Sequence, residues 1–257
     1  MTKEFSRRDF MATAGKLLAM GSLIPLGDLV LPKGAAAEQA VPVKSWPETW
    51  NGKEWCFVVD TPKCIGCGRC VKACKEENGV PMDKEVYRTC VERYLEDANG
   101  KVKIDSPDGG QAFTPTPGNY DKQFFVPKLC NQCKKPVCVQ ECPVGASYRT
   151  GDGVVLVDRQ RCIGCGYCVQ ACPYGVRYIH PVLHVADKCT WCYHRLVKGM
   201  LPACVEVCPM GVRKIGNSKD PAGEVPKIIK EKPVRLLKPD MGTQPNVYYV
   251  SLDEVVE

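Results

Sequence analysis

A chain of 257 residues with 23 Gly and 21 Pro is long enough for one compact unit or two small ones and is rich in loops. After residue 37 its hydrophobic runs are only as long as strands, which excludes a transmembrane helix in that part. The formal net charge of +6 by itself gives no support to nucleic-acid binding, and eighteen of the residues are cysteines.

Residues 1–37 have the features of a twin-arginine signal peptide. The pair Arg7-Arg8 precedes an apolar stretch from Met11 to Leu31, and three alanines ending at Ala37 follow it. We expect cleavage after Ala37; an uncleaved membrane anchor is the alternative, although two charged residues interrupt the apolar stretch. Since this route exports folded proteins, it predicts a peripheral protein on the periplasmic side of the cytoplasmic membrane.

The next segment leads into a first group of cysteines and away from it. Residues 38–53 resemble a linker, and Glu54 to Asp60 is predicted as a strand. A short helix is expected after Cys70, ending near Asn78-Gly79. Val86 to Tyr94 alternates like a strand, and residues 96–122 are rich in turn formers. The stretch from 79 to 123 is therefore predicted to be an insertion.

From residue 124 onward the chain is dense in cysteines and repeats itself. Cys130 and Cys162 begin similar runs 32 residues apart, which marks a duplicated unit. Between them, the turn signal at residues 151–153 precedes a predicted strand from Val154 to Asp158, as in a hairpin. The tail from Pro221 to Pro245 is rich in Lys and Pro, and Val247 to Leu252 is predicted to be a final strand, part of the core or a docking arm.

Sixteen of the cysteines form four runs of similar spacing. The spacing is C-x2-C-x2-C-x3-C in Cys64–Cys74 and C-x2-C-x4-C-x3-C-P in Cys130–Cys142. It is C-x2-C-x2-C-x3-C-P in Cys162–Cys172 and C-x2-C-x11-C-x3-C-P in Cys189–Cys208. The third run reproduces the bacterial ferredoxin pattern, in which three cysteines bind one cube and the fourth reaches another. At four thiolates per cube, the runs predict four 4Fe–4S clusters.

Other uses of the cysteines explain less of this spacing. A zinc site needs paired C-x2-C elements, and a disulfide scaffold would leave the triplets unexplained. The haem signature C-x-x-C-H does not occur in the chain. Gly66, Gly68 and Gly166 suit a loop whose amides approach the inorganic sulfides. Because each oxidised cube with its thiolates carries about −2, the loaded protein is expected to be mildly acidic.

Several remaining residues have open roles. Cys56 and Cys90 are expected to be buried free thiols, with a disulfide between them as the alternative. Trp191 is expected to shield a cube. The histidines are too scattered for a metal site, so structural roles are expected for His180, His184 and His194. Three basic residues beside the runs would either offset cluster charge or lie on a solvated surface: Lys63, Lys188 and Arg195.

From about Trp55 to Tyr249 the chain resembles the four-cluster ferredoxin-like electron-transfer subunits of the molybdopterin oxidoreductase superfamily, such as those of polysulfide, tetrathionate and dimethyl sulfoxide reductases. The segments that carry this resemblance are KCIGCGRCVKACK, PKLCNQCKKPVC, CIGCGYCVQACPYGVRYI, ADKCTWCYHR and PACVEVCP. The resemblance implies an α+β fold of two interleaved ferredoxin-like modules. It places an outer module in residues 38–78 and 179–220, an inner module in 124–178 and a C-terminal extension in 221–257.

The resemblance also implies how the ligands are shared. The first set, for one cluster, is Cys64, Cys67, Cys70 and Cys208. The second set is Cys74, Cys189, Cys192 and Cys204. The third set is Cys130, Cys133, Cys138 and Cys172. The fourth set is Cys142, Cys162, Cys165 and Cys168. Some members of the family lack one ligand and carry a 3Fe–4S cluster; no ligand is missing here, which disfavours that variant.

By the same resemblance, the first cluster would face a molybdopterin-type catalytic subunit and the fourth a quinone-interacting membrane subunit. The chain itself would be no enzyme but would relay single electrons. One alternative is a free periplasmic carrier that docks with cytochromes, and another is a complex that reduces quinone with electrons from cytochrome c. A self-contained catalytic oxidoreductase is disfavoured, because no phosphate-binding glycine fingerprint is present.

Overall fold

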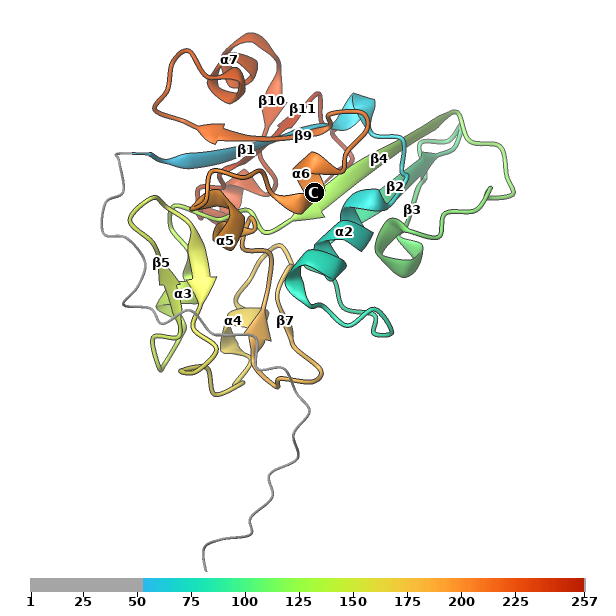
Figure 1. The fold of residues 1–257 in the computed structure, drawn as a ribbon. Helices are drawn as coiled ribbons and strands as arrows, with labels where there is room; N and C mark the ends of the chain where they lie inside the picture. Colours follow the sequence, from blue (N-terminus) through green and yellow to red (C-terminus); the bar gives the residue numbers. More distant parts are fainter. Residues whose placement is uncertain (1–52, 257) are drawn as a thin grey trace, which may run out of the picture. The chain divides into compact units, whose positions relative to one another are not determined.

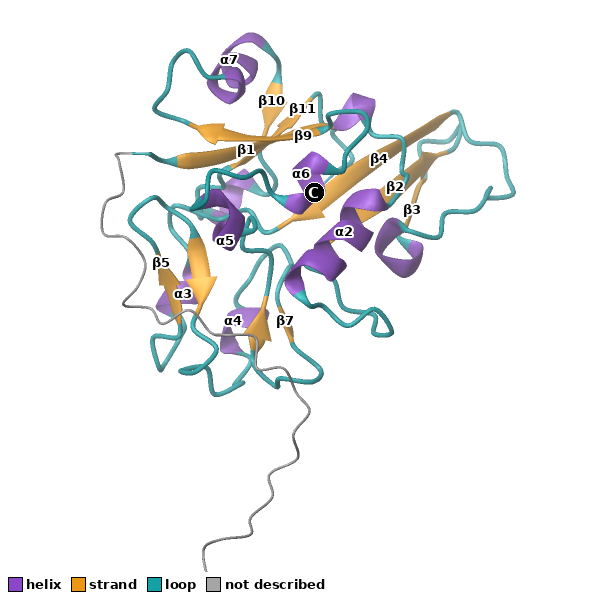
Figure 2. Ribbon diagram, in the orientation of Figure 1, coloured by secondary structure: helices purple, strands orange, loops and turns teal. Residues whose placement is uncertain are grey.

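The computed structural model describes residues 53–256 and shows a mixed arrangement of helices and strands (Figures 1 and 2). These residues lie in a single unit of the chain. The predicted signal peptide and all but the last residue of the predicted linker lie outside the described residues. Within residues 53–256 no helix combines the length and the apolar composition needed to cross a bilayer.

A four-stranded sheet joins segments from the two ends of the described chain. Its order is β10 (Val234–Arg235), β11 (Val247–Val250), β1 (Trp55–Asp60) and β9 (Arg213–Asn217). Strand β1 pairs in parallel with β11 and antiparallel with β9. The predicted strand before the first cysteine run is confirmed, and its Cys56–Asp60 segment is buried because it lies in the middle of this sheet.

The C-terminal residues contribute to the hydrophobic core. The predicted final strand forms as β11, and Val247 and Tyr249 are fully buried. Helix α7 (Glu224–Glu231) packs Val225 against Cys56 and Val58 of β1. Between the two possibilities for the tail, strand β11 is therefore part of the core.

A second sheet has two strands in the region predicted as an insertion and a third that continues into the segment predicted as the inner module. Its order is β3 (Val102–Asp105), β2 (Thr89–Glu96) and β4 (Lys122–Leu129), with both pairings antiparallel. Strand β2 begins three residues later than predicted. The description of residues 96–122 as turns was wrong for β3, which is short and largely solvent-facing and so carries no apolar run. Strand β3 is stabilised by its pairing with β2, which the composition of the segment does not reveal.

Two short hairpins flank the third cysteine run. The predicted hairpin is confirmed as β5 (Ser147–Arg149) and β6 (Val155–Val157). The second consists of β7 (Tyr178–Ile179) and β8 (Ala186–Asp187), which lie between the third and fourth runs. The cysteine runs thus alternate with small antiparallel pairs.

Most helical segments are single turns. Helix α2 (Arg69–Asn78) ends at Gly79 in the left-handed region, where the sequence predicted its end, but it begins before Cys70. The other α-helical turns are α3 (Val137–Gln140), α4 (Tyr167–Gln170), α5 (Tyr193–Leu196) and α6 (Ala203–Glu206). Of these turns, α3, α4 and α6 each carry one cysteine. The 3-10 turns are η2 (Thr61–Lys63), η3 (Pro107–Gly110) and η4 (Pro239–Met241). Helix α2 packs against α6, and α3 packs against α4.

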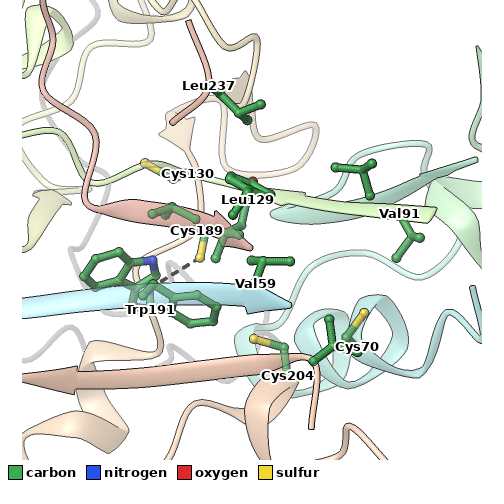
Figure 3. Packing of buried hydrophobic residues seen from close by; sticks show 14 of the residues in the cluster. Val59, Cys70, Val91, Leu129, Cys130, Cys189, Trp191, Cys204 and Leu237 are labelled. Atoms are coloured by element: carbon green, nitrogen blue, oxygen red, sulfur yellow. Dashed lines mark hydrogen bonds between the residues drawn. The ribbon is translucent and has the colours of Figure 1, made fainter. Parts of the chain in front are cut away.

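Much of the core consists of residues in and beside the cysteine runs. Figure 3 shows Cys70, Cys130, Cys189 and Cys204 among aliphatic side chains of the main hydrophobic cluster, together with Trp191. The fold therefore places the cysteines of different runs inside one interior.

Candidate metal centres

Cysteines from the first and fourth runs line one cavity. Cys64, Cys67 and Cys70 come from the loop after η2 and the first turn of α2, and Cys208 follows α6. Arg213 closes the cavity from β9. These four cysteines are the first predicted set.

The second predicted set lies deeper. Cys74 interacts electrostatically with Cys189, Cys192 and Cys204, and all four are buried. The side-chain amide of Asn78 donates to the sulfurs of Cys74 at 3.6 Å and Cys192 at 3.7 Å. An amide hydrogen bond to a sulfur stabilises it as a thiolate.

A second cavity brings together the third predicted set. It is lined by Cys130, Cys133 and Cys138 of the second run and by Cys172 of the third, with Arg177 beside them. The Cys133 thiol interacts electrostatically with the other three cysteines.

The sulfurs of the fourth predicted set have separate surroundings. Cys142 Sγ accepts a hydrogen bond from the backbone N–H of Ser147 at 3.4 Å. Cys162 Sγ accepts one from Ala186 at 3.3 Å, Cys168 lies beside Arg177, and Cys165 is exposed. That these four cysteines share one cluster is an expectation from the family resemblance.

Glycines shape the turns around the first and third runs. Gly66, Gly68 and Gly164 have φ of 69°, 68° and 69°, a region that side-chain-bearing residues rarely adopt. A Cβ on Gly66 would lie 2.3 Å from the ring of Phe125, and one on Gly164 would lie 2.4 Å from the carbonyl of His184. The loops can follow this course only because these residues lack side chains.

Burial makes several of these thiols poor acids without a metal, because it raises their pKa. Desolvation raises the pKa of Cys64 and of Cys133 to about 11, and that of Cys189 to about 12. Cys142 differs: burial alone would raise its pKa, but backbone N–H groups, including those of Ser147 and Ala146, lower it overall. Binding of metal must therefore release protons from the thiols whose pKa is raised in this way.

Sequence reasoning missed several polar residues at these sites. Arg177 and Arg213 are almost fully buried at the two cavities, and each has one Nη atom without a hydrogen-bond partner in the described structure. Asn131 is completely buried, with neither side-chain atom paired within residues 53–256. The arginines had a signal in the sequence, because Cys-Pro-x-Gly-Val-Arg-x-Ile occurs twice. Asn131 had none beyond its place next to Cys130.

The basic residues beside the runs differ from one another. Lys63 is half exposed and pairs with Asp60 at 3.2 Å, whereas Arg195 bonds Glu77 at 2.7 Å. Lys188 is completely buried and donates to the carbonyl of Cys189 at 2.9 Å, so a solvated role is wrong for it. Its burial depends on the surrounding strands and cannot be read from composition.

Two thiols, Trp191 and the histidines were also singled out in the sequence. Cys56 is buried and Cys90 half-buried; both are free thiols in the structure. Trp191 is buried, and its backbone N–H donates to Cys189 Sγ at 3.4 Å (Figure 3). His180 accepts two backbone hydrogen bonds and His194 contacts Glu77, consistent with structural roles.

The residues present fit cubane clusters. The cysteines of the first and third sets line cavities, and those of the second set are buried, with Cys74 interacting with the other three. Unpaired buried N–H groups at the two cavities point to an anionic occupant. Within residues 53–256 no group of three or more His, Cys, Asp or Glu is gathered tightly enough to hold a single metal ion. A cubane does not need such convergence, because its four ligands bind four different irons. The fold and these sites define an iron–sulfur protein of the ferredoxin type.

Comparison with known proteins specifies the family. Residues 122–218 match the 4Fe–4S dicluster domain and residues 57–77 the 4Fe–4S binding domain. One tetrathionate reductase subunit, from Salmonella typhimurium, is 37% identical over 97% of this chain and 89% of its own length. Its counterpart from Archaeoglobus fulgidus is 46% identical over 80% and 86%. The Hdr-like menaquinol oxidoreductase iron–sulfur subunit 1 of the same archaeon is 33% identical over 96% and 98%.

The chain therefore belongs to the iron–sulfur electron-transfer subunits of the molybdopterin oxidoreductase family. It binds several 4Fe–4S clusters and serves as the electron-transfer subunit of a respiratory oxidoreductase complex.

Proposed function

We propose that the chain holds four 4Fe–4S clusters in the four predicted ligand sets. They are carried by two interleaved ferredoxin-like modules and form a path for single electrons. The pairing of β1 with β9 supports the outer module, because these strands flank the first and fourth runs. The packing of α3 on α4 supports the inner module in the same way. When bound, the clusters supply one-electron redox chemistry; the chain positions them and excludes water.

The exposure of the ligands supports two ends for this path. Cys67 of the first set and Cys165 of the fourth are exposed, whereas every cysteine of the second set is buried. Beside the exposed cysteines, Ile65 and Ile163 are 55% and 65% exposed at the same position of the C-I-G-C repeat. Apolar residues left in water next to an exposed ligand favour docking of a partner there. The exposure of these two cysteines and two isoleucines is the observation that supports the proposal most directly.

The partners are proposed from the family. A molybdopterin-type catalytic subunit would dock at the first set and a quinone-interacting membrane subunit at the fourth. The names of the relatives support both kinds of partner, since one belongs to a tetrathionate reductase and another to a menaquinol oxidoreductase. Which partner supplies the electrons depends on the physiological substrate.

Matched substitutions test the two docking ends. We expect Ile65→Glu to weaken co-purification of the catalytic subunit and Ile163→Glu that of the membrane subunit, because each buries a charge in an apolar contact. Ile104→Glu is the control, since Ile104 is 52% exposed on β3, away from the cysteine runs. Iron content should stay unchanged in all three. Isolation from native cells of a redox-competent monomer without partners would instead favour the free carrier.

We also propose export of the folded, cluster-loaded chain by the twin-arginine route, supported by Arg7-Arg8 and the apolar stretch after them. Replacing both arginines with lysine should leave the protein in the cytoplasm, measured by cell fractionation. Periplasmic accumulation of that variant would contradict this route.

A further inference from the structure

Two arginines occupy the same place in a repeated sequence. The pattern Cys-x3-Cys-Pro-x-Gly-Val-Arg-x-Ile occurs at Cys168–Ile179 and again at Cys204–Ile215. Arg177 and Arg213 each follow the last cysteine of their run by five residues. In the second run the corresponding position is Ser147, which has no charge. Each predicted module thus contains one such arginine.

Arg213 lies between cysteines of the first and second sets. It begins strand β9, is 2% exposed, and donates from Nη2 to the hydroxyl of Thr89 at 2.9 Å. Its guanidinium interacts with Cys70 on α2 and Cys204 on α6. Nη1 has no partner in the described residues. One side of the guanidinium is therefore fixed to the protein, and the other is left for an occupant of the cavity that Arg213 lines.

Arg177 repeats this arrangement between the third and fourth sets. It is 4% exposed and donates from Nη1 to the hydroxyl of Ser147 at 2.9 Å, while Nη2 is without a partner in the described structure. Its guanidinium interacts with Cys138 of the third set and Cys168 of the fourth. In both modules the arginine therefore lies between the third cysteines of two runs.

The charge of these side chains calls for a negative partner. Within residues 53–256, neither arginine forms an ion pair with an aspartate or glutamate. A buried guanidinium without a counter-ion is costly, and an arginine remains charged at any physiological pH. The anions that these cavities offer are the cysteine thiolates and the clusters they would hold.

We propose that Arg177 and Arg213 set the reduction potentials of the clusters, each acting on both clusters of its own module. This rests on the proposed ligand sets. Reduction adds one negative charge to a site that already carries about −2, so a fixed cation and its N–H donors stabilise the reduced form more than the oxidised form. Each arginine thereby raises both potentials of its pair.

Redox titration of the purified holoprotein, followed by low-temperature EPR, tests the proposal. At a fixed ambient potential, Arg213→Gln should lower the ratio of reduced to oxidised cluster about tenfold in the outer pair, a shift of about 59 mV for a one-electron couple. The inner pair should titrate as in the unmutated protein. Arg177→Gln should show the reverse selectivity. The corresponding lysine variants keep the charge and should restore most of the ratio.

A matched control separates loss of a buried arginine from loss of a charge beside a cluster. Arg93 is also buried, but its partners are Asp105 and the carbonyl of Thr114, and it lines neither cysteine cavity. Arg93→Gln should reduce stability without moving any potential. If Arg177→Gln and Arg213→Gln both kept all their clusters with unchanged reduction potentials, the proposal would be overturned. The cluster assignment would remain intact. Absence of clusters from the unmutated protein would instead refute the proposed function.

If a glutamine variant does not assemble its clusters, a measurement on the unmutated chain tests the proposal instead. With arginine labelled with ¹⁵N in the guanidino group, pulsed EPR of the reduced inner pair should detect ¹⁵N coupling. In Arg177→Lys this coupling should disappear or weaken. No ¹⁵N coupling at any cluster of the labelled protein would overturn the proposal.

Discussion

At the scale of single residues, a buried ion pair is connected through Asn78 to cysteines of the second predicted ligand set. Arg88 donates to both carboxylate oxygens of Asp187, at 2.9 Å and 3.0 Å, and to Asn78 at 2.6 Å. Asn78 in turn donates to the sulfurs of Cys74 and Cys192. The orientation of the amide at the sulfurs is therefore held by a charge pair shielded from water.

Removing the charge of Asp187 should be costly. Asp187→Asn leaves Arg88 buried without a counter-ion, so the free energy of unfolding should fall by about 3–5 kcal/mol in denaturant titrations. Asp83→Asn is the control, because Asp83 is exposed in its pair with Lys84, and it should change stability by about 0–1 kcal/mol. Equal stability of the two variants would contradict the role given to this pair.

The same pair has a signed pH dependence. Burial alone would raise the pKa of Asp187, but Arg88 and Tyr178 hold it below its usual range. A carboxylate whose pKa is lowered by folding stabilises the fold above its unfolded value of about 3.9, and this contribution is lost as pH falls through the folded value. In Asp187→Asn that part of the acid-induced loss should be missing.

At the scale of elements, two equivalent glycines have different surroundings. Gly68 and Gly166 precede the third cysteine of their runs by two residues, with φ of 68° and 80°. A Cβ on Gly68 would lie 2.6 Å from the carbonyl of Gly110 in η3, whereas nothing lies within 4 Å of one on Gly166. The predicted insertion therefore packs against the loop of the first cysteine run. In the loop of the third run, the space beside Gly166 is open.

Alanine at these positions should report that difference. Both variants bear the cost of a left-handed residue, about 1–2 kcal/mol. Gly68→Ala adds a steric overlap of about 1–3 kcal/mol, so its Tm should be several degrees below that of Gly166→Ala. Thermal unfolding of the two holoproteins checks this, and equal Tm values would mean that η3 does not press on the loop.

The helices and strands also differ in how well the sequence predicts them. Strand β1, the end of α2 and the β5–β6 hairpin were predictable, because an apolar run or a glycine turn marks each of them locally. Strand β3 was not predictable, because it is largely solvent-facing and carries no apolar run. The burial of Lys188 was not predictable either, because it depends on contacts such as that with Val155, 33 residues away in the chain. The family resemblance grouped the cysteines of the first three sets from the sequence alone. The arginines beside them lie in a repeated sequence pattern, but only the fold shows that they line the cavities.

At the scale of the whole molecule, the cysteine runs serve as both core and candidate ligands. Cys70, Cys130, Cys189 and Cys204 belong to the main hydrophobic cluster, so the occupants of the cavities would be part of the interior. With few long helices or strands to bury, the fold should depend on its clusters for stability, as small metal-binding domains do.

The central claim is that one chain holds four cubane clusters. Iron and acid-labile sulfide in the purified holoprotein, measured with low-temperature EPR of the reduced form, test it most directly. The account predicts about sixteen irons and sixteen sulfides per chain, with the spectrum of interacting 4Fe–4S clusters. Clearly fewer than about four cubes per chain, in protein isolated without air exposure, would contradict it.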